Sequence, residues 1–452
     1  MNNRPNDCNG GFDIVIGNPP YVEAKKLKHI ASDLKHYNVA SGTADLSIYF
    51  IELAQNLCRN NGNLCFITTN KFYNTGFGKS LRKYLLEKKI THLIDFEQCE
   101  VFENVLVSSV ILSVKKCSPS EDNKFLFHRF IKLNHKEFKG EFVKDQNNFS
   151  TFCQKNLDEN EWSFATGEKA LLKVKLEKLP KIKELNGVQV YRGVTTGYNP
   201  AFIISDKQRD ELIKKDKNNA SIIKNMLQGR NIRKWYYNES DENLIFTRRG
   251  VDISQYPIIE QHLKVFYKQL KPKVKSTDAD GRKPGSYKWF EILDNTAYYP
   301  HFEKKEKIIW GLTADKWAFT LDTEQHYLPS NGYIMTSKTL PTKFLLGLLN
   351  SKVLHFYFGF IGVMTAGGAY TLKAATIEAL PIPSSVNDEQ QQPIISLVDQ
   401  ILSAKKEKPQ VDTTLLEHQI DLLVYHLYGL TFEEAKIIDE NLTEEEFNIT
   451  LI

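Results

Sequence analysis

Residues 12–21 read FDIVIGNPPY, in which a short apolar run ends at glycine and meets Asn-Pro-Pro-Tyr. An apolar run of this length before a turn signal is typical of a buried β-strand. An amphipathic helical stretch, a second apolar strand, another helix and two further strands follow. Their predicted ranges are 45–58, 64–68, 79–88, 91–97 and 107–114. The alternation of strands and helices predicts a doubly wound parallel sheet, with the last two strands added as a hairpin.

Further along the chain, the composition changes three times. Residues 118–165 are polar and broken and predict a connector. Residues 166–385 contain short strand-like runs separated by Gly, Pro and Asn and interrupted by helical stretches, which is typical of an α+β domain. Residues 386–452 show two helical patterns, the second at 414–427, and predict a helical C-terminal end.

Composition and charge exclude several classes of protein. The chain has 452 residues with 41% apolar and 25% charged content, which excludes collagen-like and disordered proteins. No apolar run of about 18 residues predicts a membrane span, and the polar N-terminus does not resemble a secretion signal. The six cysteines form no CxxC pair, so we expect no metal site, no disulfide framework and a cytoplasmic location.

The charge is unevenly distributed. Residues 386–452 carry 14 Asp or Glu against 4 Lys or Arg, whereas the whole chain has a formal charge of +4, so residues 1–385 carry +14. A basic body attracts polyanions, and nucleic acid is the obvious candidate. The alternative is a lysine-rich surface that is merely solvated.

The tetrapeptide Asn18-Pro19-Pro20-Tyr21 carries the predicted chemistry. It follows the first strand at its carboxyl end, where doubly wound sheets hold their ligand crevice. Two successive prolines remove two backbone donors and leave their carbonyls free to point outward. Asn18 adds a side-chain acceptor and Tyr21 adds an aromatic face. This set suits an exocyclic amino group on a flipped-out base; a plain turn is the alternative.

This segment and several later ones resemble a known family. FDIVIGNPPYV resembles motif IV of the amino-DNA methyltransferases, in the adenine-N6 branch with a C-terminal target-recognition domain. LCFITTNKF at 64–72, and EVFEN with VSSVILSV at 100–114, resemble the strand and hairpin that follow motif IV. GVTTGYN at 193–199, LQGRNIRKW at 227–235 and residues 416–431 resemble the specificity domain and its helical end. The whole chain is similar to the TaqI-type and Eco57I-type methylases of restriction-modification and phage-defence systems.

The resemblance assigns a role to each part of the chain. Residues 1–117 would be the C-terminal half of a class I methyltransferase α/β sheet, and residues 166–385 a TaqI-like target-recognition domain. The implied reaction moves a methyl group from S-adenosylmethionine to a flipped adenine. Asn18 and Pro19 would accept the hydrogens of the amino group, and Tyr21 would stack on the base. Phe102 would clamp the other face if it is the aromatic residue of the family's hairpin, a role for which Phe96 competes.

The family's cofactor-binding motifs normally precede motif IV. Only 17 residues precede Asn18 in this sequence, and they contain no G-x-G loop. The corresponding sheet would keep the family's strand order 4-5-7-6, and the FDIVI strand would become an exposed apolar edge. We therefore expect no cofactor-binding residue beyond the Asn18 edge. The N-terminal half would come from a separate chain or be lost, and the nuclease of some relatives would also be absent.

Residues of the second domain are candidates for binding double-stranded DNA. Loops that mix small, hydroxyl and aromatic residues with arginine are typical of contacts to phosphates and base edges. The basic segments add donors for phosphates. The candidates are Arg192, Thr195, Thr196, Tyr198, Arg230, Arg233, Lys234, Arg248, Arg249, Lys271, Lys273 and Lys275.

Two other functions remain open from the sequence. The chain could be a non-catalytic DNA-binding specificity subunit or an inactive remnant. Alternatively, the Asn-Pro-Pro-Tyr segment could methylate a protein amide or RNA, although the large second domain favours DNA. We expect no metal role for His418 and His426, which flank the apolar stripe of the tail helix.

Overall fold

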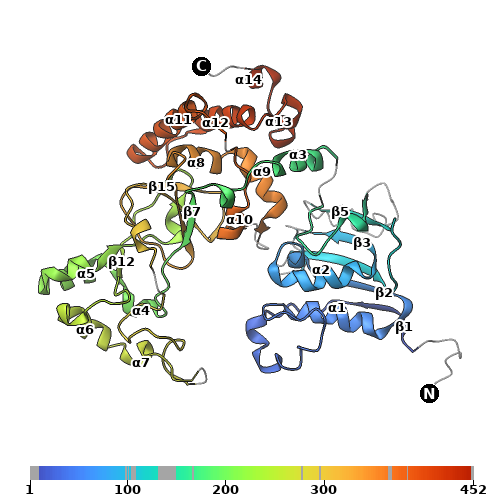
Figure 1. The fold of residues 1–452 in the computed structure, drawn as a ribbon, viewed down its shortest axis with the longest axis horizontal. Helices are drawn as coiled ribbons and strands as arrows, with labels where there is room; N and C mark the ends of the chain where they lie inside the picture. Colours follow the sequence, from blue (N-terminus) through green and yellow to red (C-terminus); the bar gives the residue numbers. More distant parts are fainter. Residues whose placement is uncertain are drawn as a thin grey trace. The chain divides into compact units, whose positions relative to one another are not determined.

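A computed structural model describes residues 10–96, 99, 101–102, 108–130, 149–164, 167–275, 278–294, 297–364, 369–383 and 385–448 (Figure 1). The chain divides into two compact units. The first contains Met1–Ala170 and Phe360–Thr371, and the second contains Leu171–Gly359 and Leu372–Ile452. Residues 118–165 therefore belong to the first unit, and the helical end belongs to the second.

The first unit is built on a six-stranded sheet in the order β1-β2-β4-β3-β5-β6. Strand β1 pairs with β2 in parallel, β3 pairs with β5 in parallel, and β4 is antiparallel to both of its neighbours. The predicted strand order and the antiparallel pair at residues 91–114 are confirmed. The strands are β1 (Phe12–Gly17), β2 (Cys58–Thr69), β3 (Lys89–Asp95), β4 (Ser109–Lys115), β5 (Lys124–Arg129) and β6 (Ser150–Cys153).

Two strands lie in the range that the sequence predicts as a connector. Strand β5 extends the sheet beside β3, and β6 pairs with it antiparallel. Phe125 and Phe127 alternate along β5 and are buried in the core of the unit. The expectation of a connector misses these strands because each is short and its flanking residues are polar. Residues 131–148 lie outside the described residues.

Helices α1 (Leu46–Leu57) and α2 (Lys79–Leu86) cover the sheet of the first unit. Ile48 and Ile51 of α1 and Leu81 and Leu85 of α2 are fully buried, as expected for the apolar stripes of amphipathic helices. The chain enters β2 directly after α1, because the helix ends at Leu57 and the strand begins at Cys58. Residues 59–62 instead form an irregularity opposite β1, where pairing shifts from Phe12↔Cys58 to Ile14↔Asn63.

The second unit contains two small antiparallel sheets around one apolar core. A four-stranded sheet has the order β15-β13-β16-β7, and a three-stranded sheet has the order β8-β12-β9. This arrangement confirms the predicted α+β class. The strands are β7 (Gln189–Arg192), β8 (Ile203–Ser205), β9 (Ile223–Asn225), β12 (Glu242–Ile245), β13 (Lys307–Gly311), β15 (Thr320–Asp322) and β16 (Gly332–Thr336). Shorter strands of this unit are β10 (Ile232–Arg233), β11 (Tyr236–Tyr237) and β14 (Thr313–Ala314), whereas β17 (Val363–Met364) and β18 (Tyr370–Thr371) belong to the first unit.

Helices complete the second unit, and α11 packs against both α8 and α12 (Figure 1). No single described helix is long and apolar enough to cross a membrane, although α8 and α9, bent by 63°, would together have the length and composition. The helices are α3 (Gly167–Glu177), α4 (Asn199–Phe202), α5 (Asp206–Lys215), α6 (Pro257–Lys264), α7 (Tyr267–Leu270), α8 (Thr342–Leu349), α9 (Lys352–Ile361), α10 (Ala374–Glu378), α11 (Asp388–Glu407), α12 (Thr414–Leu427), α13 (Phe432–Ile438) and α14 (Glu444–Asn448).

Candidate active site

The carboxyl ends of four parallel strands meet at one edge of the sheet in the first unit. Asn18, Asn70, Phe96 and Phe130 directly follow β1, β2, β3 and β5 at this edge. Ligands of open α/β sheets bind at the carboxyl ends of the strands. The predicted tetrapeptide therefore lies at the edge where this fold places a ligand crevice.

Asn18 offers an accessible acceptor beside the carbonyl of Pro19. Asn18 and Pro20 are exposed, whereas the ring of Pro19 is buried. The Pro20 carbonyl accepts a hydrogen bond from the Val22 amide at 3.2 Å, so the expectation that both proline carbonyls are free is wrong. Among the described residues, neither the Asn18 side chain nor the Pro19 carbonyl has a hydrogen-bond partner. Two acceptors therefore remain for a ligand.

Tyr21 is anchored at the end of β2. Its hydroxyl donates a hydrogen bond to the Ile67 carbonyl at 3.2 Å. Burial raises the pKa of the phenol, and a hydrogen bond with Ser109 opposes this shift only in part. The side chain is thus neutral near pH 7 and presents its ring as an apolar face.

The rings of Tyr21 and Phe102 lie side by side in an edge-to-face arrangement. Their centroids lie 6.4 Å apart at an interplanar angle of 63°, and both side chains are half-buried. Phe96, the competing candidate, is fully buried and stacks on Phe130 with a centroid distance of 5.3 Å. Phe96 therefore belongs to the core, and Phe102 is the aromatic residue that lies beside Tyr21.

A buried carboxylate that the motif search did not single out links the carboxyl ends of β2, β3 and β5. Asp95 is fully buried and accepts a hydrogen bond from Asn70 Nδ2 at 2.9 Å. Arg129 donates to Asp95 Oδ2 from both Nε and Nη2, at 3.1 and 3.0 Å. The acidic residue at the end of a predicted strand was a usable signal for this network. Arg129 was missed because β5 was not predicted.

Strand β1 forms an apolar, unpaired edge of the sheet. Among the strands that the structure describes, it pairs with β2 alone, and Ile14 and Ile16 are 63% and 76% exposed. A cavity of about 300 Å³ lies between this strand and α1, lined by Ile16, Asn18 and Pro20 together with apolar residues of the helix. The predicted exposed FDIVI edge is confirmed.

The described residues around Asn18 do not form a complete S-adenosylmethionine site. The cavity beside β1 is mainly apolar, whereas a donor with a ribose and an amino-acid group needs several polar partners. The residues present therefore make one wall of such a site at most. Among the described residues, no group of three His, Cys, Asp or Glu side chains could hold a metal ion.

In the second unit, part of the predicted DNA-binding set is exposed. Arg192 is exposed and uses only Nε, which donates to the Ser330 carbonyl at 2.7 Å. Arg230 is 74% exposed in its ion pair with Glu242, and Arg248 lies over the Tyr299 ring. Lys275 is also exposed, whereas Lys271, Lys273 and Thr195 are half-buried.

The other predicted residues have partners within the fold. Thr196 is buried and donates to Asn199 Oδ1 at 2.6 Å. Lys234 pairs with Glu417 at 2.5 Å, and Arg249 donates to the carbonyls of Ile292 and Leu293. Tyr198 packs against the apolar core, and Arg233 donates to the carbonyls of Arg230 and Ile232.

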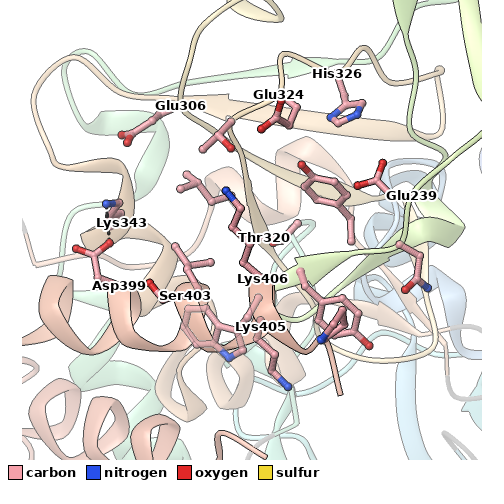
Figure 2. A pocket seen from close by; sticks show the side chains of 18 of the residues that line it. Glu239, Glu306, Thr320, Glu324, His326, Lys343, Asp399, Ser403, Lys405 and Lys406 are labelled. Atoms are coloured by element: carbon pink, nitrogen blue, oxygen red, sulfur yellow. Dashed lines mark ion pairs between the residues drawn. The ribbon is translucent and has the colours of Figure 1, made fainter. Parts of the chain in front are cut away.

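A larger cavity of about 680 Å³ lies in the second unit between β11, β15, α8 and α11. Figure 2 shows Glu306 and Glu324 on one side of it and Lys343 with Asp399 on another. Lys343 is paired with Asp399 at 2.6 Å. None of the predicted site residues lines this cavity.

Two family models match parts of this chain. Residues 3–102 match the family described as Eco57I restriction-modification methylase, and residues 224–382 match the TaqI-like C-terminal specificity domain. The chain is 22% identical to the Type II methyltransferase M.BstVI of Geobacillus stearothermophilus, over 95% of this chain and 76% of that protein. It is also 22% identical to the Type II restriction enzyme and methyltransferase RM.Eco57I of Escherichia coli, over 94% of this chain and 47% of that protein.

A solved structure shows the same fold. The Type IIL restriction-modification enzyme MmeI, determined in complex with DNA, superposes with a TM-score of 0.60 at 14% identity. The match covers 94% of this chain and 57% of MmeI, so the chain spans about half the length of MmeI and of RM.Eco57I. The motif at the strand end, the two matched families and these relatives lead to one conclusion: the chain belongs to the restriction-modification methylases of the Eco57I and TaqI type.

Proposed function

We propose that this protein is a site-specific DNA methyltransferase that modifies the N6 amino group of an adenine flipped out of the duplex. The observation that carries the proposal is the pair of unoccupied acceptors, the Asn18 side-chain oxygen and the Pro19 carbonyl, at the carboxyl edge of the sheet. An adenine amino group has two hydrogens to donate, so these acceptors match it in number.

Hydrogen bonding at these acceptors prepares the amino group for reaction. When both N6 hydrogens are held by Asn18 and Pro19, the nitrogen lone pair is drawn out of conjugation with the ring and becomes more nucleophilic. S-adenosylmethionine, the methyl donor that family membership implies, supplies an electrophilic methyl group. Orientation of the bound base accounts for most of the proposed rate, because positioned reactants reach effective molarities of about 10⁵ M or more.

Tyr21 and Phe102 would hold the purine between their rings. A base in contact with both rings needs planes about 7 Å apart, since each carbon contact takes about 3.5 Å. The centroids are 6.4 Å apart and the planes are inclined by 63°, so one ring has to turn before the base enters. Tyr21 is held by its bond to Ile67, which makes Phe102 the ring that turns.

We further propose that a separate polypeptide supplies the cofactor-binding half by adding a strand to β1. The unpaired backbone of β1 and its exposed Ile14 and Ile16 form an edge that accepts a parallel strand. The neighbouring cavity, with Asn18 at its border, would become one wall of the completed site.

The partner proposal is tested with Ile14→Lys/Ile16→Lys. Both positions are exposed, so the free chain should keep its stability, whereas two charges in a buried strand pair should abolish association with a partner encoded beside this protein. Sedimentation of the mixture measures the complex. Leu415→Lys, at an equally exposed position on α12, is the matched control and should associate like the parent. Equal association of the double variant would contradict the proposal.

The proposed reaction is tested in the mixture with that partner, by transfer of a labelled methyl group to duplex DNA. Asn18→Ala should lower the rate by about 10²–10³-fold, the usual cost of removing one group that stabilises a transition state. Asn18→Asp keeps an acceptor oxygen and is the matched variant, expected to retain more activity. Transfer by Asn18→Ala at the parental rate would exclude this site.

The alternative is a specificity subunit that binds DNA without catalysis. The surface charges of Arg192, Arg230 and Arg248 support DNA binding under either proposal. The two functions differ in one result: a non-catalytic subunit would bind duplex DNA but transfer no methyl group with any partner. Competition between duplex DNA and RNA for binding separates the nucleic-acid substrates.

A further inference from the structure

A braced loop in the second unit, described at residues 270–275 and 278–282, presents one valine between two lysines. Val274 is 89% exposed, more than any other large apolar side chain among the described residues. Lys273 and Lys275 flank it in the sequence. A single exposed apolar residue is common on protein surfaces and needs no function. The bracing of this loop and its charge are what set Val274 apart.

A buried arginine holds the loop where it joins the rest of the domain. Arg282 is 4% exposed and donates to the carbonyls of Leu270, Thr196 and Trp289 at 2.8, 2.8 and 2.9 Å. The backbone also closes on itself, because Lys273 N donates to Arg282 O and Arg282 N donates to Lys271 O. These bonds tie the loop to the GVTTGYN segment, which contains Thr196.

The carboxylates of the loop are already engaged. Asp278 Oδ2 accepts the amides of Val274 and Lys275 at 3.0 and 2.9 Å, which fixes the backbone on either side of the valine. Asp280 pairs with Lys268 at 3.4 Å. Among the described residues, Lys271, Lys273 and Lys275 have no ion-pair partner, so the loop presents uncompensated positive charge.

We propose that this loop enters a groove of duplex DNA, with Val274 in apolar contact with the bases and Lys273 and Lys275 on the flanking phosphates. The inference rests on the proposed DNA function and adds to it an element that reads the bases. Phosphate contacts position a protein, whereas apolar side chains in the groove contact base edges or thymine methyl groups. Because the loop is held rigidly where it joins the domain, less conformational entropy is lost when this contact with DNA forms.

The two kinds of residue should act differently on binding. Val274→Ser removes apolar burial but no charge, so we expect about tenfold weaker binding to the recognised duplex with an unchanged salt dependence. Lys275→Gln removes one phosphate contact, so the slope of log K against log salt should fall by about 0.9. Fluorescence anisotropy of labelled duplexes, measured with the full chain at several salt concentrations, gives both quantities.

A matched control and a rescue variant make the test specific. Val174→Ser replaces an exposed valine on α3, outside the loop, and should bind like the parent. Val274→Ile keeps an apolar side chain at this position and should bind duplex DNA with the affinity of the parent. Parental affinity of Val274→Ser would overturn this inference while leaving the proposed function intact. Failure of the parent itself to bind any duplex would overturn both.

Discussion

The two units differ in where they expose apolar side chains. In the first unit, exposed apolar residues gather on β1 and the adjoining α1, as Phe12, Ile14, Ile16, Leu53 and Leu57. In the second unit, they are spread over separate helices and loops, as Leu171, Val174, Val265, Tyr267, Val274 and Leu415. Scattered apolar residues are ordinary, whereas a contiguous apolar edge marks an interaction surface. The second unit has a closed core, and the sheet of the first is open to a further strand.

The two units also differ in the exposure of two polar sites, the Asn18 side chain and the Lys307–Asp322 pair. At the sheet edge of the first unit, the Asn18 side chain is exposed and available. In the second unit, Lys307 and Asp322 are both fully buried and bonded to each other. The first unit therefore leaves a polar side chain accessible at this edge, whereas the second unit uses its buried Lys307–Asp322 pair for the fold. Substitutions at these positions can test that difference.

The largest expected effect is on the stability of the second unit. Lys307→Met should lower the free energy of unfolding by about 3–5 kcal/mol, because it leaves Asp322 buried without its cation. Burial alone would raise the pKa of Asp322, but hydrogen bonds from His326 and Lys307 and their charges hold it below its ordinary value. Urea denaturation followed by tryptophan fluorescence measures the loss.

A double variant separates charge from packing at this position. Lys307→Met/Asp322→Asn removes both charges but keeps one acceptor oxygen, which can accept the amide of either Glu324 or His326. Asp322 now accepts these two amides on separate oxygens, at 3.0 and 2.9 Å. The double variant should therefore recover part of the lost stability. Equal stability of Lys307→Met and the parent would mean that this buried pair does not support the fold.

A second stability effect depends on pH. Asp421 of α12 accepts the Lys352 amide at 2.7 Å, and burial raises the pKa of its carboxyl to about 6. The folded state then keeps the proton up to about pH 6, whereas the unfolded chain loses it near pH 4, so stability falls as pH rises between these values. The loss amounts to roughly 3 kcal/mol. Asp421→Asn should remove it and be more stable than the parent at pH 7.

The difference in unfolding free energy between Asp421→Asn and the parent, measured from pH 4 to pH 7, isolates this carboxyl. His355 contributes a slope of the opposite sign, because burial lowers its pKa to about 4 and its stabilising effect is lost as pH falls. Since both proteins contain His355, its slope cancels in the difference. A difference that stays constant with pH would exclude the shifted Asp421.

The comparison between units also explains what the sequence could predict. The positions of β1 to β4 follow from local apolar runs, whereas their order and the exposed edge follow from the family resemblance that the motif at residue 18 carries. Strands β5 and β6 could not be predicted, because they are held by pairing with β3 and by Phe125 and Phe127 rather than by a long local pattern.

Within the candidate sites, residue type alone did not separate ligand contacts from structural ones. Arg230 and Arg249 look equivalent in sequence, yet one is exposed and the other donates to two backbone carbonyls. Phe96 and Phe102 differ in the same way, since one is stacked in the core and the other faces Tyr21. These distinctions depend on tertiary partners that lie far away in the sequence.

The smallest expected effect is on base binding in the first unit. Phe102→Ala should weaken the binding free energy of a flipped base by about 1–3 kcal/mol, the usual contribution of one stacked aromatic ring. It should change the free energy of unfolding much less than a core substitution would, because Phe102 is only half-buried. Fluorescence of 2-aminopurine at the target position, in the complex with the cofactor-binding partner, measures the hold on the base.

Phe102→Tyr is the matched variant, because it keeps a ring of the same shape and should keep the fluorescence of the parent. Phe102→Ala should also leave overall duplex affinity less affected than Val274→Ser, since the proposed phosphate and groove contacts lie in the second unit. If Phe102→Ala unfolded the protein as readily as Lys307→Met, the residue would belong to the core. Phe102 would then resemble Phe96, which is stacked on Phe130 in the core of the same unit.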